Sequence, residues 1–370
     1  FISNYLILKE LKPDMVFMYN DCWIINTSLS IACEKLDIPH YYTEQSNVLD
    51  YSHFDSNAIW YDGDINKKEL PEWNIEKERK LNERLNGYLE KYELGVASMI
   101  GEEEKISKMS HNRKFIFVPL QIMDDSKNIK YSPLIDNMIQ LVNLVIDHTP
   151  KGYDIIFKRH PWEKYKKDAI YYRCLKEIIK IAKKHDHVKI CRYESSQSLL
   201  KQCSAFVTVN STMAQENLYQ ARAPMVLLGD DFVRGWGFSY DVNNIEEFPI
   251  KLREALDKGV TPEMEKKMKQ FLYLYFFEYI VKGTYRIEYP ILDKSGKVSE
   301  QVIKPQIYEH IAEKMQIELM EIKKRKENGF KRMLPPIKKF KCMIDRSKIP
   351  NYQGVVLDAE FKGYHPKTHV

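Results

Sequence analysis

Phe115-Ile-Phe-Val-Pro-Leu-Gln-Ile-Met-Asp-Asp125 is the stretch that decides the fold, because an apolar run of strand length ends abruptly in two carboxylates. Two later runs have the same form: residues 153–158 lead into Arg159-His160-Pro161, and residues 205–209 lead into Asn210-Ser-Thr212. Such continuous apolar runs are typical of buried parallel strands. Open α/β sheets bind their ligands at the carboxyl ends of these strands. Acidic, basic and hydroxyl groups at three strand ends therefore predict an enzyme that handles a phosphorylated donor.

The rest of residues 113–260 alternates between strand and helix patterns. Strands are expected at 114–119, 153–158, 187–191, 205–209 and 224–228. Helices are expected at about 133–148, 165–184, 196–202, 212–221 and 244–257. Pro and Gly fall between these elements, as at Pro150 and Gly229. The alternation predicts a doubly wound parallel sheet.

Residues 1–112 show the same alternation on a smaller scale. Strands are expected at 15–19 and 38–43, and helices at 4–11, 24–36 and within 74–110. The segment 45–72 has no clear period, which predicts a long loop of functional or mobile character. The chain opens on Phe1 rather than Met, so we expect the first strands of this unit to lie upstream of it.

Composition excludes several classes of protein. Hydrophobic residues make up 44% of the 370 residues, which is enough for two cores and excludes global disorder. The net charge of +5 is too weak to predict nucleic-acid binding. The 6 cysteines lack paired CxxC spacing, and this favours a reducing cytoplasm. No apolar run approaches the roughly 20 residues that cross a bilayer, and we expect no signal peptide.

The carboxylates at strand ends have two interpretations. Asp124 and Asp125 can form a turn, or one of them can act on an anomeric carbon as nucleophile or base. Glu44 ends an earlier strand in the same way and is its candidate partner across a cleft between two domains. Asp230 and Asp231 also follow an apolar run, but no further ligand lies at suitable spacing. We expect a loop at the sheet edge there, and no metal site.

The basic and hydroxyl groups are equally ambiguous when taken singly. Ser211 and Thr212 can simply cap the following helix, or can bind a phosphate at its N-terminus. His160 is held extended by the following proline and can be a surface residue or an anion ligand. Lys158 and Arg159 beside it fit an anion site, and equally fit solvated side chains. Together, the strand ends predict a donor phosphate bound at the edge of the sheet.

Several motifs resemble those of the capsule polysaccharide β-Kdo transferases of Gram-negative bacteria, which transfer Kdo (3-deoxy-D-manno-oct-2-ulosonic acid) from CMP-Kdo with retention of configuration. The resemblance covers roughly residues 40–260. It rests on Q-x-x-x-D (Gln121–Asp125), K-x-H-P (Lys158–Pro161) and N-S-T (Asn210–Thr212) followed by Glu216. Glu44 and Asp55 match the spacing of a further acidic pair, although Gln45-Ser46 stands where a glycine-containing turn is expected.

The resemblance implies a role for each matching residue. Asp125 is the expected nucleophile, Glu44 the acid/base for the acceptor hydroxyl, and His160 the group that neutralises the leaving CMP phosphate with Lys158. The remaining donor-binding candidates are Asn210, Ser211, Thr212, Gln121 and Glu216. Ser211 and Thr212 would bind the phosphate or the Kdo carboxylate, and Gln121 would orient the site. No cofactor or metal is expected, because positive groups can stabilise the leaving phosphate.

The implied fold is α/β and GT-B-like: two Rossmann-like domains with a cleft between them and a helical C-terminal extension. We expect an acceptor-side domain at 1–112, a CMP-sugar-binding domain at 113–260, a helical and hairpin extension at 261–330 and a basic tail or linker at 331–370. The expected partners are CMP-Kdo and a glycan or glycolipid acceptor. The basic segment at 323–341 can touch an anionic membrane or remain solvated, so we expect the cytoplasm or the inner face of the inner membrane.

Two other functions fit the same residues. Another CMP-sugar transferase, similar to a sialyltransferase, would use the same leaving group. A noncatalytic glycan-binding module could keep the fold, although it would have no need of Glu44, Asp125 and His160 together. Substitution of Asp125 by Asn separates these readings, since it would abolish transfer but leave glycan binding intact.

Overall fold

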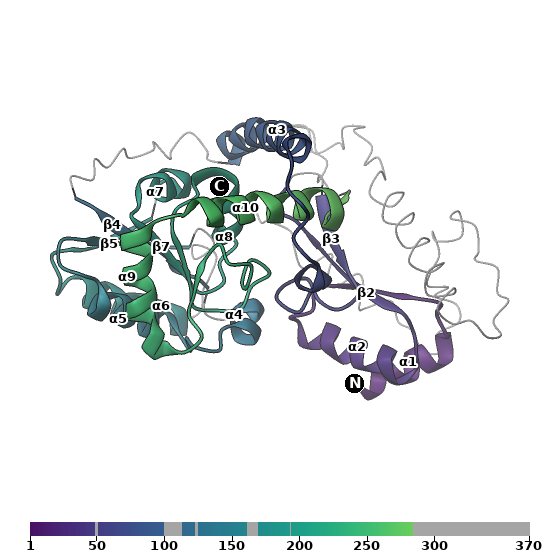
Figure 1. Cartoon of the computed structure of the whole chain (residues 1–370). Helices are drawn as coiled ribbons and strands as arrows, with labels where there is room; N and C mark the ends of the chain where they lie inside the picture. The colour runs from purple at the N-terminus through teal and green to yellow at the C-terminus, as the bar shows by residue number, and fades with distance from the viewer. Residues whose placement is uncertain (49–50, 100–112, 123–124, 161–168, 193, 284–370) are drawn as a thin grey trace, which may run out of the picture. The chain divides into compact units, whose positions relative to one another are not determined.

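The computed structural model describes residues 1–283 except 49–50, 100–112, 123–124, 161–168 and 193 (Figure 1). The described residues fall into two compact units. The first contains residues 1–16 and 28–39, and the second contains residues 17–27 and 40–283. The hairpin, helix and basic tail expected after residue 284 lie outside the described residues.

The first unit is built from helix α1 (Ile2–Leu11) and most of helix α2 (Ile24–Lys35). Leu8, Ala32 and Cys33 are buried together and form its core. Helix α1 ends at Lys12 in the left-handed conformation, with φ 46°, and Pro13 follows. A proline there prevents the helix from continuing, so sequence and structure agree on its end.

A four-stranded sheet has the order β1-β2-β3-β10. Its strands are β1 (Val16–Tyr19), β2 (His40–Gln45), β3 (Tyr51–Asp55) and β10 (Val281–Lys282). Strand β3 runs antiparallel to both β2 and β10. The expectation of a loop throughout 45–72 is therefore wrong: the segment contains β3 and a short 3₁₀ turn, η1 (Asp64–Lys67). Polar side chains hid the strand, because Ser52 and His53 are both buried in it.

The second sheet is parallel and six-stranded, with the order β6-β5-β4-β7-β8-β9. Its strands are β4 (Phe115–Pro119), β5 (Asp154–Lys158), β6 (Val188–Cys191), β7 (Ala205–Thr208), β8 (Met225–Leu227) and β9 (Tyr240–Asp241). The prediction of a doubly wound parallel sheet is confirmed. Strand β9, with only two residues, was not predicted.

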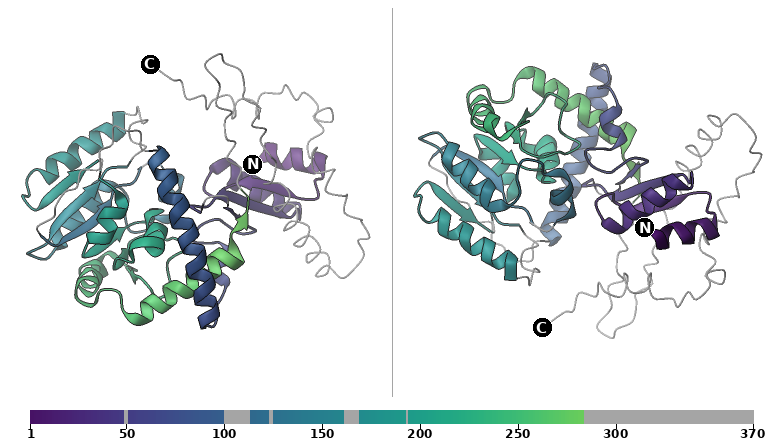
Figure 2. Two further views of the ribbon diagram at one scale, coloured as in Figure 1. Left: turned by 90° about the horizontal axis from the view of Figure 1, so that it is seen from above. Right: turned by 90° about the horizontal axis from the view of Figure 1, so that it is seen from below.

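Helices cover this sheet, with α5 and α6 side by side (Figures 1 and 2). The helices are α4 (Ser126–Tyr131), α5 (Met138–His148), α6 (Ala169–Ala182), α7 (Ser196–Gln202), α8 (Met213–Glu216) and α9 (Phe248–Lys258). A π turn, η3 (Asn217–Ala221), continues α8, and a 3₁₀ turn, η4 (Ile245–Glu247), precedes α9. Helix α4 was not predicted, since its six residues are too few to show a period.

The strand order reverses between β4 and β7. From β4 the chain adds β5 and β6 toward one edge of the sheet, and from β7 it adds β8 and β9 toward the other. In doubly wound sheets such a reversal opens a crevice at the carboxyl ends of the two strands, and ligands bind there. Gln121 follows β4 and Asn210 follows β7. The sequence motifs therefore lie at the point of the fold best suited to a ligand.

Helices α3 (Ile75–Met99) and α10 (Pro262–Leu274) pack against each other, as Figure 2 shows. Lys269 Nζ lies 2.7 Å from Glu78 Oε1 in this contact. The single helix expected over 262–282 is confirmed as far as Tyr279: α10 passes into a π turn, η5 (Tyr275–Tyr279). Only the last three residues differ, because Val281 and Lys282 form β10. Among the described helices, none is long and apolar enough to cross a membrane.

Replacing Gly229 should test how closely the ends of β7 and β8 approach. A Cβ there would lie 2.8 Å from Val209 Cγ1 and 2.9 Å from the carbonyl oxygen of Tyr131. We expect Gly229→Ala to lower the free energy of unfolding by about 1–3 kcal/mol, because backbone has to shift. Gly87→Ala is the matched control: a Cβ there meets nothing within 4 Å in helix α3, so urea denaturation should show no loss of stability.

Candidate active site

Asn210 and Gln121 form a buried amide cluster at the reversal of the strand order. Gln121 Nε2 donates to Asn210 Oδ1 at 2.8 Å and to Asn128 Oδ1 at 2.7 Å. Asn210 Nδ2 donates to the carbonyl oxygens of Lys127 and Tyr131, at 3.4 and 3.2 Å. These two predicted donor-site residues are therefore brought together. Their amide groups hold helix α4 against the ends of β4 and β7.

Asp125 stands at the start of helix α4 with its side chain exposed. Its Oδ1 accepts a hydrogen bond from the backbone N–H of Lys127 at 2.9 Å, which caps the helix. The turn and the catalytic interpretations of this residue are thus compatible, since an exposed capping carboxylate still faces solvent. Asp124 lies outside the described residues.

Glu44 lies near the end of β2 with its carboxyl group buried. Its Oε1 accepts a hydrogen bond from the Tyr19 hydroxyl at 3.3 Å, whereas its Oε2 has no hydrogen-bond partner among the described residues. Burial raises the pKa of Glu44 from 4.5 to about 7, against the opposing effect of the Lys127 charge. A carboxyl with a pKa near neutrality can both give and accept a proton at physiological pH.

Lys127 carries the positive charge that lowers the pKa of this carboxyl, and the sequence analysis did not identify it. Its ammonium is 2.6 Å from Asp231 Oδ2 and 3.6 Å from the ring centroid of Trp60. Asp231 lies in the loop that follows β8, as expected, but it is fully buried there. An isolated charge would be costly there, and the ion pair together with the aromatic face offsets that cost.

Asp21 organises the neighbouring loop and was also missed. Its Oδ2 accepts hydrogen bonds from the Tyr131 hydroxyl at 2.6 Å and from Lys130 Nζ at 2.7 Å. Its Oδ1 accepts from the backbone N–H of Ile59 at 2.9 Å. The negative charge of Asp21 also contributes to the raised pKa of Glu44. Helix α4 thereby contacts Asp231 through Lys127 and Asp21 through Lys130 and Tyr131, and the charge of Lys127 also acts on Glu44.

Asp55, the acid that the family resemblance pairs with Glu44, holds the local structure together through hydrogen bonds. It is buried at the end of β3 and accepts hydrogen bonds from the Tyr279 hydroxyl at 2.8 Å and the Asp64 N–H at 2.7 Å. Burial raises its pKa to about 6. With its lone pairs engaged by the loop that follows, Asp55 fixes the path of the chain toward Trp60.

Lys158 and His160 lie at the end of β5. Lys158 is buried, and its Nζ donates to the carbonyl oxygen of Arg192 at 3.2 Å, so its ammonium is fixed beside the end of β6. His160 is half-buried. Pro161, which completes the K-x-H-P motif, lies outside the described residues.

Ser211 and Thr212 lie between β7 and α8. The Ser211 hydroxyl accepts from the backbone N–H of Met213 at 3.3 Å, and the carbonyl of Thr212 accepts from the N–H of Gln215 at 3.1 Å. Thr212 is exposed, while Glu216 is half-buried within α8. Asn47 Nδ2 reaches Gln215 Oε1 at 3.0 Å, which brings the loop after β2 to this junction.

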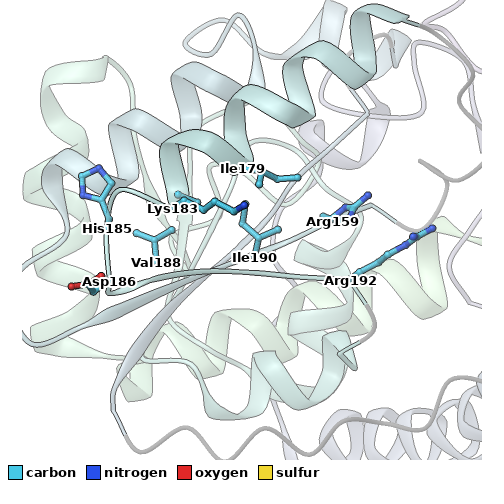
Figure 3. A pocket seen from close by; sticks show the side chains of 9 residues that line it. Arg159, Ile179, Lys183, His185, Asp186, Val188, Ile190 and Arg192 are labelled. Atoms are coloured by element: carbon cyan, nitrogen blue, oxygen red, sulfur yellow. The ribbon is translucent and has the colours of Figure 1, made fainter.

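A basic groove of about 460 Å³ lies elsewhere, along α6 and the edge strand β6. Figure 3 shows Arg159 and Arg192 at one end, His185 and Asp186 at the other, and Lys183 between them. The Arg159 N–H continues the ladder to Cys191, and alternation along the strand turns its side chain away from the face that carries Lys158 and His160. The groove is therefore distinct from the residues around Glu44.

Within the described ranges, no group of three or more His, Cys, Asp or Glu side chains is arranged to hold a metal ion. Asp231, the acid that most resembled a ligand, binds Lys127 instead. No local pattern points to Lys127 or Lys130, because their partners Asp231 and Asp21 are 104 and 109 residues away in the sequence.

Removing the cation of the buried ion pair should destabilise the protein strongly. Lys127→Met leaves Asp231 buried without its partner, and we expect a loss of about 3–5 kcal/mol in the free energy of unfolding. Adding Asp231→Asn removes the unpaired charge and should recover part of that loss. Urea denaturation of the single and double variants measures the difference, and equal stabilities would contradict a paired Asp231.

Glu44 should make stability depend on pH. Because its pKa is raised from 4.5 to about 7, the folded protein holds the proton more tightly than the unfolded chain. The stabilising contribution is therefore complete below pH 4.5 and is lost as the pH rises through about 7. Between pH 5 and 8, wild type should lose on the order of 2 kcal/mol relative to Glu44→Gln.

Denaturant unfolding at both pH values measures this difference. Glu246→Gln removes an exposed carboxyl and is the control, for which no such change is expected. If the stabilities of wild type and Glu44→Gln changed in parallel with pH, folding would not raise the pKa of Glu44.

Known proteins resemble this chain at three levels. Residues 56–277, more than half of the chain, match the family model of capsule polysaccharide biosynthesis proteins. FixF of Sinorhizobium fredii is 26% identical over 180 residues, and the match covers 46% of this chain and 39% of FixF. The chain thus spans well under half the length of this curated relative.

Two solved structures of KpsC from Thermosulfurimonas dismutans have a similar fold. The β-Kdo 2,7 transferase has a TM-score of 0.50 at 16% identity, over 87% of this chain and 89% of that chain. The β-Kdo 2,4 transferase has a TM-score of 0.50 at 15% identity, over 73% and 81% respectively. The predicted GT-B-like α/β fold is confirmed, and so is the capsule polysaccharide part of the predicted family. The chain belongs to the family of capsule polysaccharide biosynthesis proteins.

Proposed function

We propose that this protein is a retaining glycosyltransferase that transfers Kdo from CMP-β-Kdo to a glycan or glycolipid acceptor of a bacterial surface polysaccharide. Membership of the capsule family supports a role in polysaccharide synthesis. The fold it shares with β-Kdo transferases supports the choice of donor, together with the Q-x-x-x-D, K-x-H-P and N-S-T motifs at matching strand ends.

The single observation that carries the proposal is that one residue, Lys127, acts on both acids: its backbone on Asp125 and its charge on Glu44. Asp125 accepts from the backbone N–H of Lys127, and the charge of the same residue acts on the buried carboxyl of Glu44. One carboxylate is exposed and the other has a pKa of about 7. Two acids in such different environments suit the roles of nucleophile and acid/base.

The reaction follows from these roles. A carboxylate oxygen of Asp125 attacks the anomeric carbon of Kdo, the bond to the phosphate breaks, and its electron pair leaves with CMP. The acceptor hydroxyl then attacks the glycosyl-enzyme ester while Glu44 takes the hydroxyl proton, and Asp125 is released as a carboxylate. Two inversions at one carbon give net retention.

The leaving phosphate requires positive and hydrogen-bonding groups. We assign His160 to it, with the hydroxyls of Ser211 and Thr212, and Lys158 as a fixed positive charge nearby. Helix α8 has four residues, so its dipole is short and the hydroxyls are the stronger ligands. Gln121 and Asn210 are engaged with each other, which makes them positioning residues for α4.

The same proposal extends to organisation and location. We assign the acceptor to residues 1–112 and the CMP moiety to residues 113–260, with Glu216 on the donor side. The cysteines lack paired spacing, which favours a reducing compartment, so we place the reaction in the cytoplasm or at the inner face of the inner membrane. A contact of the basic segment 323–341 with anionic lipid belongs to this proposal; the segment lies outside the described residues.

A trapped intermediate tests the mechanism directly. Loss of CMP needs no proton from Glu44, whereas attack by the acceptor needs Glu44 as base. Incubation of Glu44→Gln with CMP-Kdo generated in situ should therefore accumulate one covalent Kdo, which peptide mass spectrometry locates on Asp125. Asp125→Asn should form no adduct, although Asn still caps helix α4.

Other results would redirect the assignment. An adduct on a different carboxylate would move the nucleophile but keep the reaction. Turnover of CMP-sialic acid in place of CMP-Kdo would indicate another CMP-sugar transferase. If the folded wild-type protein released CMP from neither donor, the proposed activity would be wrong.

A further inference from the structure

Two large aromatic side chains, Tyr19 and Trp23, lie exposed and in contact with each other, and Tyr19 reaches the buried carboxyl of Glu44. Tyr19, the last residue of β1, is 39% exposed, and Trp23, just before α2, is 47% exposed. Their ring centroids are 5.5 Å apart with an interplanar angle of 62°. We call Tyr19 and Trp23 the aromatic platform. Adjacent exposed aromatic rings next to a functional group are characteristic of binding sites rather than of ordinary surface.

The loop between the two rings is fixed by hydrogen bonds. Asn20 Oδ1 accepts from the backbone N–H of Cys22 at 3.2 Å, and its carbonyl oxygen accepts from Asn26 Nδ2 at 2.8 Å. Asp21 is held by the bonds to Lys130, Tyr131 and Ile59 described above. The carbonyl of Trp23 accepts the backbone N–H of Thr27 at 2.9 Å. The platform is therefore preorganised, which lowers the entropic cost of binding a ligand on it.

The platform is joined to Glu44 by a hydrogen bond. The Tyr19 hydroxyl donates to Glu44 Oε1 at 3.3 Å, so one edge of the platform lies at the carboxyl group itself. A ring-shaped ligand that packs on Trp23 would thus meet Tyr19 at its edge, within reach of the proposed base. A sugar meets this requirement: one face carries C–H groups that pack on aromatic rings, and its edge carries hydroxyls.

We propose that the aromatic platform binds the acceptor sugar, packing the apolar face of the sugar ring against Trp23 and placing its edge beside Tyr19, so that one hydroxyl meets Glu44. This assignment rests on the proposed function, because it takes Glu44 as the group that accepts the hydroxyl proton. It names the chemical class of the acceptor end: a pyranoside with an unobstructed apolar face.

A membrane surface is the competing occupant, because Ile24 and Ile25 follow Trp23 and are 87% and 62% exposed. Helices that bind anionic membranes pair such an apolar face with lysine or arginine. Helix α2 contains no basic residue before Lys35 at its end. The hydrogen bond from the Tyr19 hydroxyl to Glu44 would also contribute nothing to binding a lipid surface. Both observations favour the sugar.

Fluorine NMR of the full chain labelled with 5-fluorotryptophan tests the proposal without requiring turnover. Trp23→Phe identifies the Trp23 resonance by its loss. The probes are methyl glycosides of galactose, glucose, N-acetylglucosamine, rhamnose and Kdo, each titrated separately. We expect at least one of them to shift the Trp23 resonance in a saturable manner. Addition of anionic phospholipid vesicles in place of the glycoside should leave that resonance unchanged.

Kinetics with the glycoside that binds most tightly provides the second readout. Trp23→Ala should raise its KM about tenfold, and Trp23→Phe should restore most of the affinity because it keeps a ring. Ile24→Ala, which truncates the more exposed neighbouring side chain, is the matched control and should leave the KM unchanged.

The outcomes separate this proposal from the proposed function. The adduct experiment on Glu44→Gln uses no acceptor, so it tests the reaction independently of the platform. If the adduct forms but no glycoside shifts the Trp23 resonance, the platform assignment is overturned and the reaction stands. A Trp23 resonance that responds to vesicles alone, or a KM that rises equally in Ile24→Ala, would also overturn it.

Discussion

The side chain of Asn210 is the interaction on which the rest of the site depends. It accepts from Gln121 and donates to carbonyl oxygens at both ends of helix α4. A helix of six residues has little stability of its own, so its position must come from such contacts. Because α4 carries Asp125, Lys127, Lys130 and Tyr131, one buried amide determines where four functional side chains lie.

Charge is the second constraint. Lys127 bonds to Asp231 and lies over Trp60, so its ammonium is fixed and only its longer-range field reaches Glu44. The charge of Lys127 lowers the pKa of Glu44 by less than burial raises it. The pKa is therefore about 7, and the carboxyl is close to half-protonated at neutral pH. A direct salt bridge would have held Glu44 ionised and removed its ability to carry a proton in both directions.

The sequence predicted the parts of the fold that have a repeating pattern. The second sheet and helices such as α7 (Ser196–Gln202) follow from continuous apolar runs and caps. Strand β3 was missed because Ser52 and His53 are polar side chains that find partners only after folding. Strand β10 was missed because the aromatic run before it continues the helical pattern. Strands β3 and β10 form because they pair with each other, and local sequence preference does not reveal that pairing.

The site residues also fall into those that the sequence could predict and those that it could not. Glu44, Asp125, Lys158 and His160 could be predicted because strand ends are visible in a sequence. Asp21 and Lys127 could not, because their importance depends on partners about a hundred residues away: Asp21 and Tyr131, for example, are 110 residues apart. No local pattern records such a pairing. The roles of the predicted residues remain proposals, whereas the family and the fold class are established.

The pairing of β3 with β10 has a consequence for how the chain folds. Ser52 Oγ donates to the carbonyl oxygen of Gly283, across 231 residues of sequence. During synthesis the first sheet therefore exposes an unpaired edge until the second sheet has been completed and the chain has returned. Contacts so distant in sequence slow folding and prolong the time in which an open edge can capture another chain. Truncation anywhere before residue 281 would make that exposure permanent, so an incomplete copy of this chain should aggregate rather than persist as a partly active monomer.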